Sequence, residues 1–198
     1  SGNVLDNDED LDEGTALIVT NAGTFVGEFG TLELAADGSY TYTLDNEAAQ
    51  PLDDGDSRLE AFEYEITDGA ALNPFTAGAT LYVYIDGMND APVVAGDGAA
   101  VMEDVVLQAS GNVLANDGDP DDGDELAVID APALYTGAYG TLALEVDGGF
   151  VYTLENNSAV VQSLAGGETQ IDSFTYGADD GSEVAAGVLD IAVLGTND

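Results

Sequence analysis

The sequence predicts an all-β protein built from two tandem Greek-key β-sandwich domains. Two observations predict this fold class: one series of motifs occurs twice along the chain, and each copy is rich in short segments in which apolar and polar residues alternate. About seven such segments in roughly 95 residues are typical of a Greek-key sandwich. An up-and-down barrel is the competing architecture.

The motifs of the first copy recur in the same order about 110 residues later, which is the length of one small domain. We therefore expect one domain at 1–90 and a second at 91–198, with Pro92 and the glycines of Gly96-Asp97-Gly98 near the boundary. The matched pairs are SGNVL (1–5 and 110–114), FGTLEL with YGTLAL (29–34 and 139–144), DGSYTYTLDN with DGGFVYTLEN (37–46 and 147–156), FEYEITDG with FTYGADDG (62–69 and 174–181), and LYVYIDGMND with LDIAVLGTND (81–90 and 189–198).

Strands are predicted where apolar and polar residues alternate, as in 40–44, 62–66 and 150–154. The dipeptides at 37–38 and 147–148 are both Asp-Gly and lie between two such runs, which predicts short hairpins because both residue types tolerate positive φ.

The two copies differ in what precedes SGNVL. VMEDVVLQA at 101–109 is a plausible first strand of the second domain, whereas the first copy begins directly at Ser1. We therefore expect the first strand of the first domain to lie outside this sequence, and the chain to be part of a longer array.

The composition is strongly acidic, with 40 Asp and Glu residues, a single basic residue, Arg58, and a net charge of −39. A single cationic side chain is too few to bind nucleic acid or an anionic membrane. Cysteine and histidine are absent, which excludes disulfides, thiolate sites and histidine-based catalytic or zinc sites. No apolar run approaches the roughly 18 residues of a membrane span. The acidity fits solubility in a salty medium, divalent cation binding, or both.

Two aligned carboxylate clusters make cation binding the sharper hypothesis. The first contains Asp8, Asp10 and Asp12, and the second contains Asp117, Asp119 and Asp121. Calcium takes roughly six to eight oxygen ligands, so it suits such loops better than magnesium does. The EF-hand pattern fails, because counting from Asp8 the required glycine and glutamate positions hold Glu13 and Val19. The alternative is a solvated acidic turn.

In their fixed order, the motifs SGNVLANDGDPDDGDELAV, YGTLAL, YTLEN and FTYGADDG resemble the VCBS-type, cadherin-like repeats of very large secreted bacterial adhesins of the RTX type. This resemblance covers nearly the whole chain twice. It implies tandem cadherin-like or immunoglobulin-like sandwiches that bind Ca²⁺ near their junctions.

The resemblance also implies a ligand set. Asn89 and Asp90, with the acids of the second cluster, would form the internal calcium site, and Glu103 would serve the junction after the second domain. Asp68 and Asp180 are further candidates, with a plain Asp-Gly turn as the alternative. The site of the first cluster would be partial.

These expectations favour a non-enzymatic extender module on the bacterial cell surface, stiffened by calcium, whose partners are neighbouring repeats of the same polypeptide. The alternative is an adhesion module that binds carbohydrate or another copy of itself. Tyr82, Tyr84 and Tyr135 would then form a sugar-stacking platform, unless they simply pack on a sheet. An enzyme is not expected, because the acids lie at repeated turns with no unique insertion that could form a cleft.

Overall fold

The computed structural model describes residues 1–10, 16–69 and 74–197. The chain divides into two compact units, Ser1–Met88 and Asn89–Asp198. Each unit is described by itself below.

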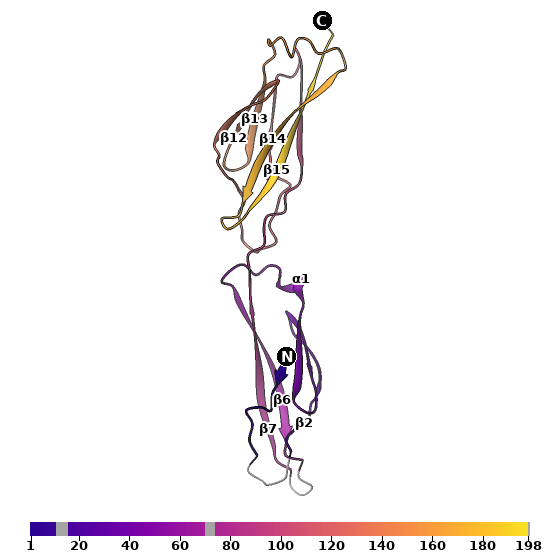
Figure 1. Ribbon diagram of the computed structural model, residues 1–198, viewed down its shortest axis with the longest axis vertical. Coiled ribbons are helices and arrows are strands. Elements are labelled where there is room, and N and C mark those ends of the chain that lie inside the picture. The colour runs from indigo at the N-terminus through magenta and orange to yellow at the C-terminus, as the bar shows by residue number, and fades with distance from the viewer. Residues whose placement is uncertain (11–15, 70–73, 198) are drawn as a thin grey trace. The chain divides into compact units, whose positions relative to one another are not determined.

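The first unit contains two sheets whose strand pairings, in the part of the unit that the structure describes, are all antiparallel. Its elements are β1 (Gly2–Asn3), β2 (Ile18–Val19), β3 (Gly23–Val26), β4 (Gly30–Leu34), β5 (Ser39–Leu44), α1 (Asn46–Ala49), β6 (Ser57–Thr67) and β7 (Thr76–Asp86). One sheet has the order β1-β5-β4-β3 and the other the order β2-β6-β7. The two long strands β6 and β7 form its longest hairpin (Figure 1).

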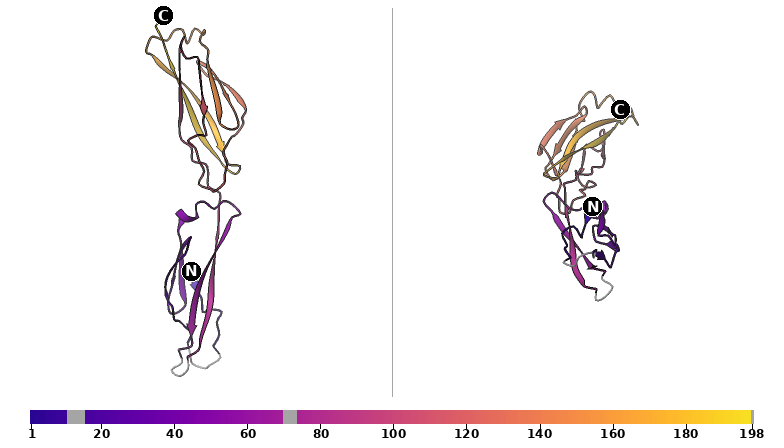
Figure 2. Two further views of the ribbon diagram at one scale, coloured as in Figure 1. Left: turned by 180° about the vertical axis from the view of Figure 1, so that it is seen from behind. Right: turned by 60° about the horizontal axis from the view of Figure 1, so that its bottom comes forward.

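The second unit repeats this architecture and has one more strand than the described part of the first unit. Its elements are β8 (Asp97–Met102), β9 (Gln108–Asn112), β10 (Ala127–Val128), β11 (Ala133–Thr136), β12 (Gly140–Leu144), β13 (Gly149–Leu154), β14 (Thr169–Asp179) and β15 (Val184–Leu194). The sheets have the orders β11-β12-β13-β9 and β10-β14-β15-β8. Figure 2 shows the long β14–β15 hairpin of the second sheet, in orange to yellow, from two further directions. The pairing of β15 with β8 is parallel.

Each core forms between the inward faces of the two sheets. In the second unit Leu142 and Tyr152 from one sheet meet Ile191 from the other, and all three are fully buried. In the first unit Leu32 packs with Phe62 in the same way. Successive strand residues point to opposite faces, so the alternating sequence pattern places one apolar face inward. The predicted all-β fold of tandem sandwiches is confirmed.

The Asp-Gly hairpins form where they were predicted, but by a different turn. Gly38 has φ of 83° and donates its N–H to Ala35 O, while the Asp37 carboxylate accepts from the backbone N–H and the hydroxyl of Ser39. Only the glycine of this pair needs positive φ, so the turn is a longer one with a left-handed glycine rather than a two-residue turn. The predicted hairpin is present, and of its two residues only Gly38 uses the positive φ that both tolerate.

The first strand of the second unit begins earlier than the sequence indicated. β8 already starts at Asp97, because this segment pairs in parallel with β15 and buries Val101 to 1% exposure. The predicted strand at 101–109 is then split at Asp104, whose φ of 59° ends β8, before β9 begins at Gln108. Glycine at position 98 did not act as a breaker, because pairing to a long strand outweighs its weak local preference.

Candidate metal centre

Three segments of the second unit bring acidic side chains together at one end of its sandwich. The carboxylate oxygens of Asp119, Asp124 and Asp180 all lie within 4.8 Å of one another. Asp90 joins the group through its backbone N–H, which donates to Asp121 Oδ2 at 2.7 Å. The side-chain amide of Asn89 donates to Asp180 Oδ2 at 3.3 Å. The segment at 89–90, the acidic loop before β10 and the β14–β15 turn therefore converge.

Local hydrogen bonds fix two of these loops. Asp119 Oδ1 accepts from the backbone N–H of Asp121 at 3.0 Å, and Asp180 Oδ1 accepts from the N–H groups of Ser182 and Glu183 at 2.6 and 2.7 Å. Burial acts to raise the pKa of Asp180, but these two N–H groups and the Asn89 amide outweigh it, so the pKa is lowered. Asp180 is therefore held as a carboxylate at neutral pH.

Two oxygens of this cluster are buried without a hydrogen-bond donor among the described residues. Asn89 Oδ1 and Asp119 Oδ2 have no hydrogen-bond partner among the described residues, although water does not reach them. The second unit contains no Lys, Arg or His, so no basic side chain within it offsets the charge. Buried oxygens without donors are costly unless a cation coordinates them. Ca²⁺ binds amide and carboxylate oxygens. The side chains of Asn89, Asp119, Asp124 and Asp180 therefore fit the ion that the sequence resemblance implies.

Asp117 has a different environment from its neighbours in the acidic loop. Its Oδ1 accepts from the backbone N–H of Ala95 at 2.8 Å, and its Oδ2 accepts from the hydroxyl of Tyr176 at 2.9 Å. Asp97 Oδ2 and Val113 O lie 2.9 and 3.0 Å from the same hydroxyl, whose single proton is shared among these three acceptors. Burial first, and the Asp117 charge to a lesser degree, raise the pKa of Asp97. Asp117 therefore ties the loop to the core through bonds of its own, whereas Asp119 and Asp121 belong to the cluster.

Glu103 lies at the other end of β15, an 11-residue strand roughly 35 Å long. Its side chain is 0% exposed. Oε2 accepts from the backbone N–H of Thr196 at 3.0 Å, and Oε1 has no hydrogen-bond partner in the described part of the chain. A buried carboxylate with one oxygen unsatisfied makes this end of the unit a second candidate position for a cation.

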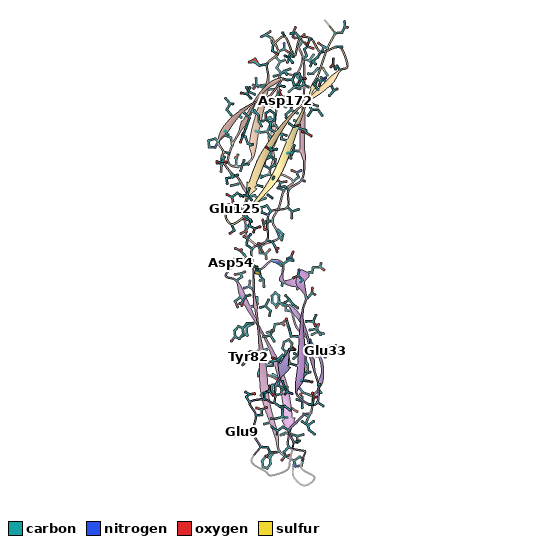
Figure 3. All side chains as sticks on the ribbon, viewed as in Figure 1. Glu9, Glu33, Asp54, Tyr82, Glu125 and Asp172 are labelled. Atoms are coloured by element: carbon teal, nitrogen blue, oxygen red, sulfur yellow. The ribbon has the colours of Figure 1, made fainter. Side chains whose placement is uncertain are left out.

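The first unit contains a counterpart of the cluster. Asp10 and Asp68, which align with Asp119 and Asp180, line one hollow of about 370 Å³ together with Glu9, labelled in Figure 3. Asp68 is 8% exposed and accepts from the N–H of Phe75 at 3.2 Å. Asp8 also has a buried oxygen, Oδ2. Asp12 lies outside the described residues.

Asp124 was missed by the sequence reasoning, although it belongs to the same acidic run as Asp119 and Asp121. The available signal was its position after Gly123, a residue type typical of turns, which here has φ of 103°.

The three tyrosines considered for sugar stacking have different environments. Tyr135 is half-buried and its ring lies 6.4 Å from that of Phe174, so it packs on the core. Tyr82, labelled in Figure 3, and Tyr84 are 56% and 69% exposed and share one face of β7. Leu59, opposite Tyr84 on β6, is also exposed. The expectation that Tyr82 and Tyr84 pack on a sheet is wrong, because no described layer covers this face.

No helix among the described residues has the length and apolar character needed to span a membrane.

The sequence model of the bacterial cadherin-like domain family matches residues 1–87 and 89–195. The calcium-binding lectin RapA2 of Rhizobium johnstonii is 29% identical over 225 residues, covering 100% of this chain and 90% of that protein.

Two solved structures show the same fold. Drosophila N-cadherin EC1-4 is 12% identical with a TM-score of 0.51, covering 96% of this chain and 44% of that one. The extracellular cadherin domains 1–5 of protocadherin gamma B2 are 18% identical with a TM-score of 0.51, covering 93% of this chain and 33% of that one. The chain thus spans less than half the length of each, and the likeness shows the fold alone.

Proposed function

Because the chain belongs to the bacterial cadherin-like domain family, we propose that it is a calcium-stabilised structural module of a bacterial surface adhesin. The family match confirms the cadherin-like repeats expected from the motifs. One observation carries the proposal: Asp119, Asp124 and Asp180 converge beside the buried oxygen of Asn89, in a unit without a basic residue.

Bound calcium would supply the divalent charge that offsets these carboxylates. In the proposed site the side-chain oxygens of Asn89, Asp119, Asp124 and Asp180 hold the ion. Asp117 positions the loop through Tyr176 and Ala95. Since the folded form presents these oxygens together and the unfolded form does not, calcium stabilises the folded form by mass action.

The proposed role is that of an extender: tandem repeats made rigid by calcium, which carry an adhesive region away from the cell surface. The two units are near-equivalent copies, which supports this role. A module that only adds length can repeat one design, whereas a ligand-binding module is expected to differ from its neighbours. Placement outside the cell supports calcium use, because extracellular modules bind calcium with dissociation constants on the order of 10⁻⁴–10⁻³ M. The calcium-binding name of the rhizobial relative supports the choice of ion.

Two measurements on the whole chain test this proposal: thermal unfolding and small-angle scattering. Each is made in calcium, in magnesium and with a chelator. We expect calcium to raise the melting temperature more than magnesium does and to narrow the distribution of molecular dimensions. Equal melting and scattering in calcium and chelator would contradict it.

A carbohydrate-binding role is the second candidate, favoured by the exposed Tyr82 and Tyr84 and by the lectin name of the relative. Flat aromatic rings at alternate positions of a strand can stack on sugar rings, and their hydroxyls can bond sugar hydroxyls. A glycan array probed with the chain and with a Tyr82→Ser, Tyr84→Ser double variant tests this role. We expect the parent chain to bind glycans and the double variant not to bind them. If neither protein bound any glycan, the carbohydrate-binding role would be contradicted.

A further inference from the structure

The side of β6 that faces away from β7 is only partly paired in the first unit. β2 pairs with β6 at two positions, Ile18↔Thr67 and Val19↔Ile66. The chain then leaves β6, and its next strand, β3, pairs with β4 of the other sheet. The half of β6 that begins at Ser57 therefore has no described strand beside it on this side.

Hydrogen bonds at the paired half of β6 show which of its residues point their main-chain groups away from β7. Asn21 Oδ1 accepts from the N–H of Glu65 at 2.9 Å, and Asn21 Nδ2 donates to Glu63 O at 3.2 Å. In an antiparallel strand the N–H and C=O groups of alternate residues point to the same side. Those of Leu59 and Ala61, and the N–H of Glu63, therefore point away from β7, and no described residue bonds them.

A hollow of about 730 Å³ follows this free edge. Its lining includes Ala61 and Tyr82 from the outward face of the β6–β7 sheet and Phe62 from the inward face. Phe25 and Val26 of β3, in the other sheet, also line it, and Val26 is 82% exposed. The hollow thus has the position of an added strand, whose side chains would alternate between the two faces. An apolar side chain on the inward face would remove the surface of Val26 from water.

Acidic side chains decide what kind of strand fits this hollow. Glu28 and Glu63 line it and are exposed. Glu60 lines it too, but its carboxylate already accepts from the Tyr42 hydroxyl and the N–H of Phe29. A second copy of the chain, with a net charge of −39, would bring carboxylates against carboxylates, and like charge at an edge prevents pairing between copies. A strand that carries Lys or Arg side chains is complementary instead.

The second unit has the same free edge without the two acids. β10 pairs with β14 at two positions, and the rest of β14, back to Thr169, has no described strand beside it on that side. In the alignment of the motifs, Thr175 takes the place of Glu63 and Ala138 takes the place of Glu28. The two edges therefore offer the same backbone groups and differ in charge. Binding that needs basic side chains should select the first unit.

We propose that the β6 edge from Leu59 to Glu63 is a binding site for a basic, extended peptide segment of another protein. The segment adds an antiparallel strand in line with β2, and its backbone bonds the free groups of Leu59 and Ala61. Its inward side chains are apolar and cover Val26, while its outward Lys or Arg side chains lie beside Glu28 and Glu63. No proposed calcium ligand takes part, so the site is independent of the metal proposal.

The test adds a short peptide of alternating Lys and Val, long enough to span the edge, to the whole chain in calcium. Amide hydrogen exchange, resolved by residue with NMR, follows the N–H groups of Leu59, Ala61 and Glu63. We expect their exchange to slow by at least about tenfold at saturation, because pairing protects them from water. The matched control peptide has the same sequence and charge but is N-methylated at its Lys residues, whose N–H groups would face β6, and should give no protection.

Variants of the chain separate the backbone contribution from the charge contribution. Ala61→Pro removes an N–H that the β6–β7 ladder does not use, which a free edge tolerates, and should abolish the protection. Glu28→Gln combined with Glu63→Gln should weaken peptide affinity about fivefold, since two charges beside the peptide are lost. Glu33→Gln combined with Glu47→Gln removes two exposed charges from other elements and should leave the affinity within about twofold.

Four outcomes would overturn the site. Unchanged exchange at the β6 edge with the Lys-Val peptide would show that the edge accepts no strand. Equal protection by the N-methylated peptide would show that charge alone attracts the peptide. Equal protection of Ser173 and Thr175 in the second unit would show that the two acids do not select the partner. Protection in the chain without peptide that rises with protein concentration would assign the edge to a second copy.

Discussion

Tyr152 donates a hydrogen bond from its hydroxyl to Asp172 Oδ2 at 2.7 Å, and both side chains are buried. Asp172, labelled in Figure 3, also accepts from the backbone N–H groups of Ala138 and Tyr139 at 2.7 and 3.0 Å. Burial, followed by the bond to Asp172 and its charge, raises the pKa of Tyr152. The carboxylate thus anchors the turn between β11 and β12 to the core without a cationic partner.

The first unit repeats this arrangement with a different acid. Glu60 accepts from the hydroxyl of Tyr42 and from the N–H of Phe29. A Cβ at Gly27 would lie 2.1 Å from the Glu60 carboxylate, and one at Gly137 would lie 2.3 Å from that of Asp172. Glycine leaves the room that the carboxylate needs. These two acids support the fold and are separate from the candidate calcium ligands.

Asp172→Ala should lower the unfolding free energy of the second unit by about 3 kcal/mol, since a buried hydroxyl and two partly buried N–H groups lose their acceptor. Urea titration read by hydrogen exchange in β13 reports this unit specifically. Asp190→Ala is the matched control: this exposed aspartate of β15 accepts from Ser173 Oγ, and its loss should cost at most about 0.5 kcal/mol. Equal losses in the two variants would contradict the anchoring role.

Asp119→Asn combined with Asp180→Asn should weaken calcium binding at least about tenfold, or ~1.4 kcal/mol, because two of the three converging carboxylates lose their charge. Isothermal titration calorimetry measures the change. Asp190→Asn removes one exposed charge from the middle of β15, opposite Ser173 and away from the β14–β15 turn, and should leave the affinity within about twofold, because a distant exposed charge is screened. An unchanged affinity in the double variant would place the ion elsewhere.

Glu103→Gln should change stability in opposite directions with and without calcium. Without the ion, the buried carboxylate has an oxygen with no donor, so a neutral side chain should raise the unfolding free energy by about 1 kcal/mol. With calcium, the variant should gain less stability than the parent. Thermal melts in chelator and in calcium measure both effects, with exposed Asp104→Asn as the neighbouring control. The same calcium gain in parent and Gln variant would show that Glu103 is no ligand.

Ser39→Ala should raise the pKa of Asp37 toward its ordinary value. The hydroxyl and then the backbone N–H of Ser39 hold this pKa below 3.8. A depressed carboxyl pKa stabilises the fold above the unfolded pKa, and this contribution is lost as the pH falls through the folded pKa. Carboxyl NMR titration of Asp37 should show the rise. A pKa that stays equally low in the variant would mean that the hydroxyl does not cause the shift.

The sequence by itself determined the all-β class, the duplication and the family, because these depend on short-range signals: alternating burial in 40–44 and 150–154, turn glycines, and motifs in fixed order. It also singled out Asp119 and Asp180 as acids of interest. It did not separate Asp117, which bonds Tyr176, from its neighbours, since alternate spacing is the same for all three.

Only the tertiary structure decided which acids meet, because the partners lie far apart in the chain. Asn89 reaches Asp180 across 91 residues, and Glu103 meets Thr196 across 93. The start of β8 at Asp97 likewise depends on β15, some ninety residues later, and no local preference reports that pairing. The exposure of Tyr82 and Tyr84 also depends on the tertiary structure. Alternation in the sequence shows that a strand has two different faces, but only packing determines which face other residues cover.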